Sequence, residues 1–207
     1  MRRATMLKIA TLMRENLDHG ITILGISKKL KIGYRPAYTH VNSMEKEGII
    51  RTERVGNAKQ SFLNLTNAKC RHLLEEVDIL RKEALLNGHV KLRNVLENLV
   101  SRLGETFISD IHSIVLFGSY AKGTPTKLSD IDLLFITVDV KNKELRAAIE
   151  RESASYQYSY NVKINPIIAD IVEFKKMLKS KDLNVGKEAR SYGIAIYGSE
   201  MFWRLVV

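Results

Sequence analysis

Two short polar clusters in the second half of the chain have the residue types of a phosphate and metal site. Gly118 and Ser119 follow an apolar run, and Asp130 and Asp132 begin another one after ten intervening residues. Glycine lets a ligand approach the backbone, and a serine with free N–H groups at the start of a helix attracts phosphate oxygens. Magnesium prefers carboxylate oxygens together with substrate phosphates. The pattern therefore favours a site for a polyphosphate and a divalent ion.

Two buried strands and a short helix are expected to position these groups. Residues 113–117 are β-branched and aromatic, residues 131–138 are apolar, and a Gly-Thr-Pro turn lies between them. Two residues along a strand place the backbones of Asp130 and Asp132 about 6 to 7 Å apart on one face. An ordinary turn and a solvated strand end would explain each cluster separately. Their combination favours a single site.

The combined pattern resembles the nucleotidyltransferase superfamily, which includes DNA polymerase beta, the aminoglycoside nucleotidyltransferases and the small prokaryotic nucleotidyltransferases of antitoxin type. The resemblance covers residues 105–207 and is closest to the small type, and the ending SYGIAIYGSEMFW is similar to their closing strand segment. It implies an α/β domain with a mixed sheet. In such a domain Gly118 and Ser119 contact the phosphates of ATP or another nucleoside triphosphate, while Asp130 and Asp132 are catalytic and hold Mg²⁺. The small members are often antitoxins encoded beside a helical toxin, so the resemblance also implies a helical protein partner.

The third carboxylate that this family takes from a neighbouring strand is missing at the expected place. That strand is predicted at residues 161–169, where the inward candidates are Lys163 and Asn165. Asp139 and Asp170 lie near other strand ends and would need a shifted geometry. Two hypotheses follow: an enzyme that transfers a nucleoside monophosphate to a hydroxyl, and a regulator that senses nucleotide or binds a partner without catalysis.

Lysines near the two clusters are candidates for phosphate contacts. Lys122 lies in the helix that is predicted to start at Ser119, and Lys127 lies in the loop before the aspartates. A lysine near phosphates acts as a point charge. Loop lysines are also commonly solvated, so we assign nucleotide binding to Lys122 and leave Lys127 open.

Composition limits the class of protein. The 207 residues are 45% hydrophobic and 27% charged, as expected of a folded chain with two domains. No apolar run approaches the roughly 20 residues that span a bilayer, so we expect a cytoplasmic protein without a membrane segment. The single cysteine, Cys70, excludes an internal disulfide, and the histidines lack metal-site spacing.

The N-terminal part is strongly basic, with 12 Lys and Arg against 5 Asp and Glu in residues 1–66. Its pattern predicts three helices and a hairpin with a turn at 56–59, and it resembles the winged helix-turn-helix of prokaryotic transcription factors. This resemblance implies DNA binding through the third helix and the wing. The residues expected to face DNA are Arg35, Tyr38, Thr39, Asn42, Arg54 and Lys59. A winged helix that docks a protein or dimerises is the alternative.

Apolar stripes at helical spacing predict two helices in residues 67–104, with a turn at Asn87-Gly88 where the stripes change phase. We interpret this segment as a connector whose stripes pack on the chain's own domains or form the seam of a homodimer. The predicted architecture is α+β. It has a winged helix at 1–66, the helical connector at 67–104 and a nucleotidyltransferase-like domain at 105–207.

Overall fold

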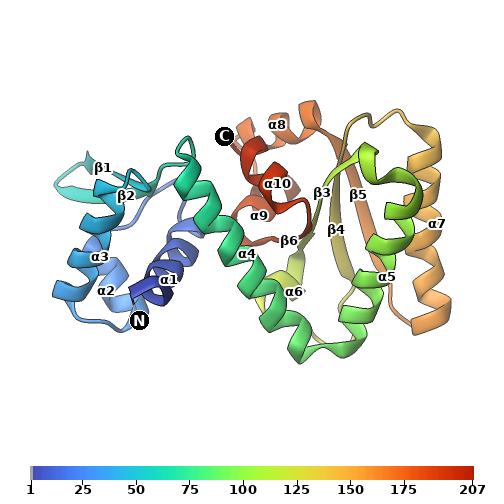
Figure 1. Cartoon of the computed structure of the whole chain (residues 1–207), viewed down its shortest axis with the longest axis horizontal. Coiled ribbons are helices and arrows are strands. Elements are labelled where there is room, and N and C mark those ends of the chain that lie inside the picture. The colour runs from blue at the N-terminus through green and yellow to red at the C-terminus, as the bar shows by residue number, and fades with distance from the viewer. Residues whose placement is uncertain (1) are drawn as a thin grey trace. The chain divides into compact units, whose positions relative to one another are not determined.

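The computed structural model describes residues 2–207 as an α+β chain that divides into two compact units (Figure 1). One unit ends at Val77, and the other comprises Asp78–Val206. Among the described residues, no helix combines the length and apolar composition that a bilayer crossing requires.

The first unit contains helices and a small hairpin, as the sequence predicts. Its elements are α1 (Arg2–Arg14), α2 (Ile23–Leu30), α3 (Tyr34–Lys46), β1 (Ile50–Val55) and β2 (Ala58–Leu63). The Thr22 hydroxyl caps α2 by accepting from the Gly25 N–H, and Ile21 pairs with Ser61 at the edge of the hairpin. The hairpin turn is shorter than predicted. Gly56, at φ +60°, and Asn57 form the turn, because residues 58 and 59 already pair with β1.

Helix α4 (Ala68–Gly88) and helix α5 (Val90–Phe107) are separated at His89. The break comes just after the predicted turn, because Asn87 and Gly88 still belong to α4. The sequence led us to expect both helices in a connector, but α5 is part of the second unit's core. Its apolar stripe is buried against the sheet and α7, through Leu92, Val95, Leu96, Leu99 and Leu103. This stripe therefore packs on the chain's own domain, and the core of that domain begins well before residue 105.

The second unit is built on a mixed four-stranded sheet of order β5-β4-β3-β6. The strands are β3 (Ile111–Phe117), β4 (Ile131–Thr137), β5 (Ile164–Asp170) and β6 (Ile194–Tyr197). Strand β3 runs antiparallel to β4 and β6, whereas β4 and β5 are parallel and are joined by the crossover helix α7 (Lys143–Tyr160). The starts of β4 and β5 therefore meet at one edge of the sheet, next to the end of β3.

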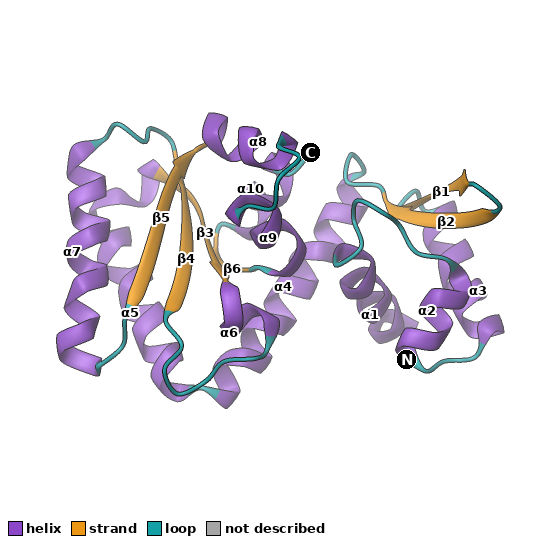
Figure 2. Cartoon of the chain, turned by 180° about the vertical axis from the view of Figure 1, so that it is seen from behind, coloured by secondary structure: helices purple, strands orange, loops and turns teal. Residues whose placement is uncertain are grey.

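Helices cover both faces of this sheet (Figures 1 and 2). Helices α5 and α7 cover one face, and the other face carries α8 (Ile171–Lys179), α9 (Val185–Tyr192) and α10 (Ser199–Leu205). Ile131, Leu133 and Phe135 point into the core under α5 and α7. Because side chains alternate along a strand, Asp132 lies on the opposite face of β4. The short helix α6 (Gly118–Lys122) follows β3.

Candidate active site

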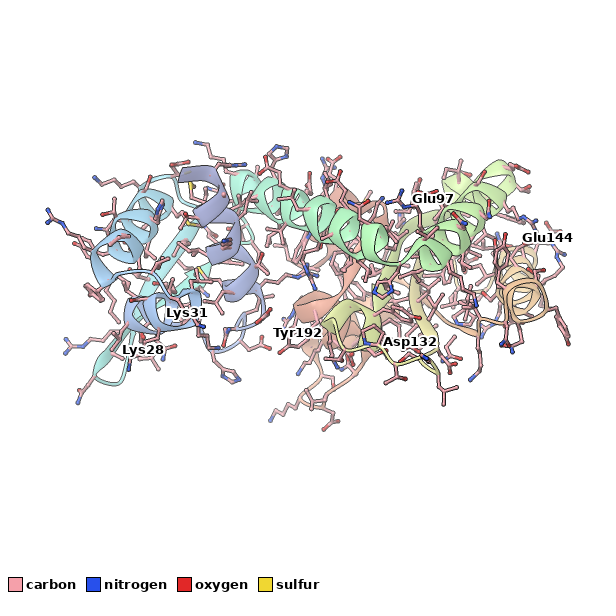
Figure 3. The ribbon with its side chains drawn as sticks, turned by 90° about the horizontal axis from the view of Figure 1, so that it is seen from below. Lys28, Lys31, Glu97, Asp132, Glu144 and Tyr192 are labelled. Carbon is pink, nitrogen blue, oxygen red and sulfur yellow. The ribbon has the colours of Figure 1, made fainter. Side chains whose placement is uncertain are left out.

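The turn after β3 presses against the first residues of β4. Phe117 pairs with Asp132 across the two strands, and Gly118 then takes a left-handed φ of +70°. A Cβ atom at Gly118 would lie only 2.2 Å from Asp132 Oδ2. Asp132 lies next to the ribbon of α6 in Figure 3. The structure therefore brings the Gly118-Ser119 turn and Asp132 into one place, and only glycine fits this approach.

Asn165 bridges the two aspartates from β5. Its amide Nδ2 donates to Asp130 Oδ2 and to Asp132 Oδ1, both at 3.1 Å. Lys163 Nζ lies 2.9 Å from the same Asp130 oxygen. Hydrogen bonds from Lys163 and from Asn165 hold the pKa of Asp130 below its ordinary value. Asp130 therefore remains an anionic ligand in mildly acidic solution.

The donor set at this edge fits a magnesium ion. Both carboxylates contact the same amide nitrogen of Asn165, so they are close enough to share one ion. A half-turn of that amide would present its oxygen, which is also a hard ligand. Because Gly118 and Ser119 lie beside Asp132, the remaining ligands can be phosphate oxygens and water. Asp130, Asp132 and Asn165 would hold the ion.

No third acidic side chain completes the cluster. Within residues 2–207, no group of three or more His, Cys, Asp or Glu is placed to share a metal ion. Asp170 pairs with Thr137 at the far end of the strands and caps α8 by accepting from the Glu173 N–H. Asp139 accepts from the Lys141 N–H in a turn. Both of these carboxylates cap backbone N–H groups away from the site.

Lys122 points toward α9. Its Nζ lies 2.7 Å from Glu188 Oε1 and 5.7 Å from the centre of the Tyr192 ring. The sequence placed Lys122 near the phosphates but did not indicate this ion pair, which depends on a residue 66 positions further along the chain. In this arrangement the side chain ties α6 to α9.

Arg81 of α4 contacts the helix that follows the Gly118-Ser119 turn. Its guanidinium donates to the Ala121 carbonyl of α6 at 3.0 Å, and to the Tyr192 and Gly193 carbonyls at 2.8 and 2.9 Å. A cation at the ends of two helices is favourable because their carbonyls carry partial negative charge. Sequence reasoning missed this residue, since no local pattern joins positions 81, 121 and 193.

The residues predicted to bind DNA lie on α3 and on the hairpin of the first unit. Arg35, Tyr38 and Thr39 on α3 are exposed, and Asn42 is half-buried. Arg54 and Lys59 are exposed on the hairpin. A groove of about 290 Å³ runs between α2, α3 and the hairpin. Its lining residues include Tyr34, Tyr38, Asn42, Glu45, Thr52 and Lys59.

The close approach of Gly118 to Asp132 predicts the effect of an alanine at position 118, and Gly123 offers a matched control. Gly118→Ala should displace the Asp132 carboxylate and abolish magnesium-dependent nucleotide binding, because its Cβ would overlap Oδ2. Gly123 has a similar φ of +74°, but its Cβ would meet no atom within 4 Å. Gly123→Ala therefore has the same backbone strain, about 1 kcal/mol, without the clash. Calorimetric nucleotide titration and urea unfolding of both variants check this. Equal loss of binding in the two would contradict it.

Comparison with known proteins identifies the second unit. The model of the family described as "Nucleotidyltransferase domain" matches residues 92–195. The chain belongs to this family.

Two relatives come from Methanocaldococcus jannaschii. "Putative protein adenylyltransferase MJ1305" is 32% identical over 115 residues, which cover 55% of this chain and 76% of the relative. "Putative protein adenylyltransferase MJ0141" is 28% identical over 92 residues, which cover 44% of this chain and 85% of the relative. A solved structure entitled "Crystal structure of the toxin-antitoxin with AMP-PNP" aligns with a TM-score of 0.34 at 21% identity, covering 52% of this chain and 81% of that one.

Proposed function

We propose that this protein transfers AMP from magnesium-bound ATP to a hydroxyl group of a protein. The observation that carries the proposal is the single Asn165 amide between Asp130 and Asp132, with the Gly118 turn against Asp132. Membership of the nucleotidyltransferase family supports the reaction class, and the names of the two archaeal relatives support a protein acceptor.

In the proposed reaction, the acceptor oxygen forms a bond to the α-phosphorus as the bond from that phosphorus to the β-phosphate oxygen breaks. Pyrophosphate leaves, and the hydroxyl proton passes to water, because Asp170 of β5 lies at the far end of the strand and caps α8. Gly118 and Ser119 would bind the phosphates through the turn and the start of α6. Asp130 and Asp132 would orient the polyphosphate through the ion. Bound magnesium would neutralise phosphate charge.

The test uses the full-length protein, magnesium and ATP labelled on the α-phosphate. Incubation with a cell extract of acceptor proteins should attach label to protein and release pyrophosphate, and chelation should stop both. A protein that binds Mg-ATP but releases no pyrophosphate and labels nothing would be a nucleotide sensor, which is the regulator hypothesis. A protein that does not bind Mg-ATP would contradict both hypotheses.

We also propose that the first unit binds DNA as a winged helix. The basic excess in residues 1–66 and the exposed face of α3 favour this second function. Lys28 of α2 and Lys31, which follows the helix, add exposed positive charge in the same unit (Figure 3). Two cations are partly neutralised, because Arg51 pairs with Glu53 and Lys59 lies 3.9 Å from Glu45. The helical toxin partner and the homodimer that the sequence suggested are further proposals.

If the first unit binds DNA, its affinity should depend on salt concentration, and Arg35 and Arg54 should contribute to this dependence. The full-length protein should bind a mixed-sequence duplex, with affinity falling steeply as salt rises, because each phosphate contact releases counterions. Arg35→Ala combined with Arg54→Ala should make the slope of log affinity against log salt less negative by about 2. Arg151→Ala, an exposed arginine of α7, is the control and should leave the slope unchanged. Fluorescence anisotropy across a salt series measures this. A slope near zero, or one equally affected by Arg151→Ala, would contradict it.

A further inference from the structure

A cleft of about 570 Å³ opens beside Asp130 in the second unit. It lies between the start of α5, the loop before β4 and the segment that joins α7 to β5. The side chains that define its character are His89, Lys91, Tyr120, Lys127, Asp130 and Lys163. The rings of His89 and Tyr120 meet edge to face with their centres 5.9 Å apart. The cleft is therefore polar and basic, with one aromatic wall.

The positive charge of the cleft is only partly neutralised by the protein. Lys163 pairs with Asp130, but within the described chain neither Lys91 nor Lys127 has an ion-pair partner. Both side chains are exposed. The long helix α5 also starts here without a side-chain cap from His89 and without an acidic residue in its first turn. Two unpaired ammonium groups and the helix N-terminus together favour an anionic ligand.

The cleft lies at a different place from the Gly118-Ser119 turn that is proposed to bind the phosphates. Gly118, Ser119 and Asp132 do not line it, whereas Asp130 and the first residues leading into β5 do. In an in-line displacement the attacking and leaving oxygens lie on opposite sides of the phosphorus. If the Gly118-Ser119 turn holds the leaving pyrophosphate beyond Asp132, the attacking hydroxyl approaches from the Asp130 side.

We propose that this cleft binds the acceptor, and that the acceptor is an acidic polypeptide segment whose carboxylates flank the modified hydroxyl. This inference rests on the proposed function. Lys91 and Lys127 would pair with the flanking carboxylates, and Lys163 would lie near the hydroxyl because it contacts Asp130. The hydroxyl oxygen would then attack the α-phosphorus, and pyrophosphate would leave.

Charge reversal tests the cleft in the full-length protein. Lys91→Glu with Lys127→Glu is compared with Lys141→Glu plus Lys143→Glu, which makes the same charge change at exposed positions beyond the far end of β4. Glu144, next to Lys143 in the chain, lies well apart from Asp132 in Figure 3. The probes are fluorescent synthetic peptides with a central Ser, Thr or Tyr flanked by Glu, and the same peptides flanked by Gln. Binding is read by anisotropy and transfer by labelled ATP.

Wild type and the Lys141/Lys143 control should prefer the Glu-flanked peptides, and the Lys91/Lys127 variant should lose about tenfold in affinity for them. Affinity for a non-hydrolysable ATP analogue should be equal in all three proteins. Lys91→Gln with Lys127→Gln should show a smaller loss in the same direction. If only the Lys91/Lys127 variant lost affinity for the ATP analogue, the cleft would be part of the ATP site and the proposal would be overturned.

Three other outcomes would also overturn it. In the first, wild type binds the Glu-flanked and Gln-flanked peptides equally. In the second, the Lys141/Lys143 control loses as much affinity for the Glu-flanked peptides as the Lys91/Lys127 variant. In the third, the protein transfers AMP to the 3′ end of an RNA oligonucleotide in preference to the acidic peptides. Failure of the proposed function is distinguishable, because it would appear as peptide binding and nucleotide binding without any release of pyrophosphate. In contrast, transfer to proteins without a preference for acidic flanks would refute only the assignment of the cleft.

Discussion

Replacing Asp132 by Asn should reduce nucleotidyl transfer by about 1000-fold. Asp132 contacts Asn165, pairs with Phe117 and lies against Gly118, so it would join the proposed metal ligands to the turn proposed to bind phosphate. Asn is close to Asp in size but lacks the negative charge that a divalent ion requires. Release of pyrophosphate from Mg-ATP, measured for wild type and variant, checks this prediction.

The control for Asp132→Asn is the same chemical change at Asp182, an exposed residue of the second unit. Asp182→Asn should leave transfer unchanged. Asp130→Asn should cause a loss similar to that of Asp132→Asn, and the double variant should be little worse than either, because in the proposed site the two carboxylates hold one ion. Transfer by Asp132→Asn at near wild-type rate would contradict the assignment of this edge of the sheet as the active site.

Replacing Asn165 by Asp should increase transfer by about 100-fold, the largest gain that we expect. The amide of Asn165 stands within 3.1 Å of both aspartates, so a carboxylate there would complete an acidic triad and could accept the hydroxyl proton. Three carboxylates without an ion repel one another. The variant should therefore be less stable than wild type in the absence of magnesium, by about 1 kcal/mol, and should recover stability when magnesium is added.

Asn165→Ala is the control for Asn165→Asp, because it removes the amide without adding a carboxylate. It removes the bridge between Asp130 and Asp132 without supplying a base, so it should lower magnesium affinity and should not raise the transfer rate. Initial rates and thermal melts with and without magnesium distinguish the two variants. A decrease in rate for Asn165→Asp, or a stability that does not respond to magnesium, would show that position 165 does not face the reacting hydroxyl.

Much of this architecture follows from local sequence alone. Apolar runs predicted the strands on both sides of the turn, and the change of phase near Asn87 predicted two helices, which the structure separates at His89. The Gly-Ser and Asp-x-Asp clusters needed only strand geometry to be placed at one end of the sheet. Lys163 and Asn165 were expected to face inward, and both donate hydrogen bonds to Asp130. The strands, the helix break and the inward direction of these side chains depend on residues close together in the chain, so spacing and residue type determine them.

Tertiary structure decided the features that join distant segments. The bridging amide of Asn165, the three carbonyls held by Arg81 and the Lys122–Glu188 pair connect residues tens of positions apart, and no periodicity reports such contacts. The apolar stripe of α5 was visible in the sequence, but whether it packed on a second copy or on its own sheet depended on which face the sheet left uncovered. Local pattern determined which groups this chain carries, whereas long-range packing decided which of them meet, because burial and hydrogen bonding act through space and not along the chain.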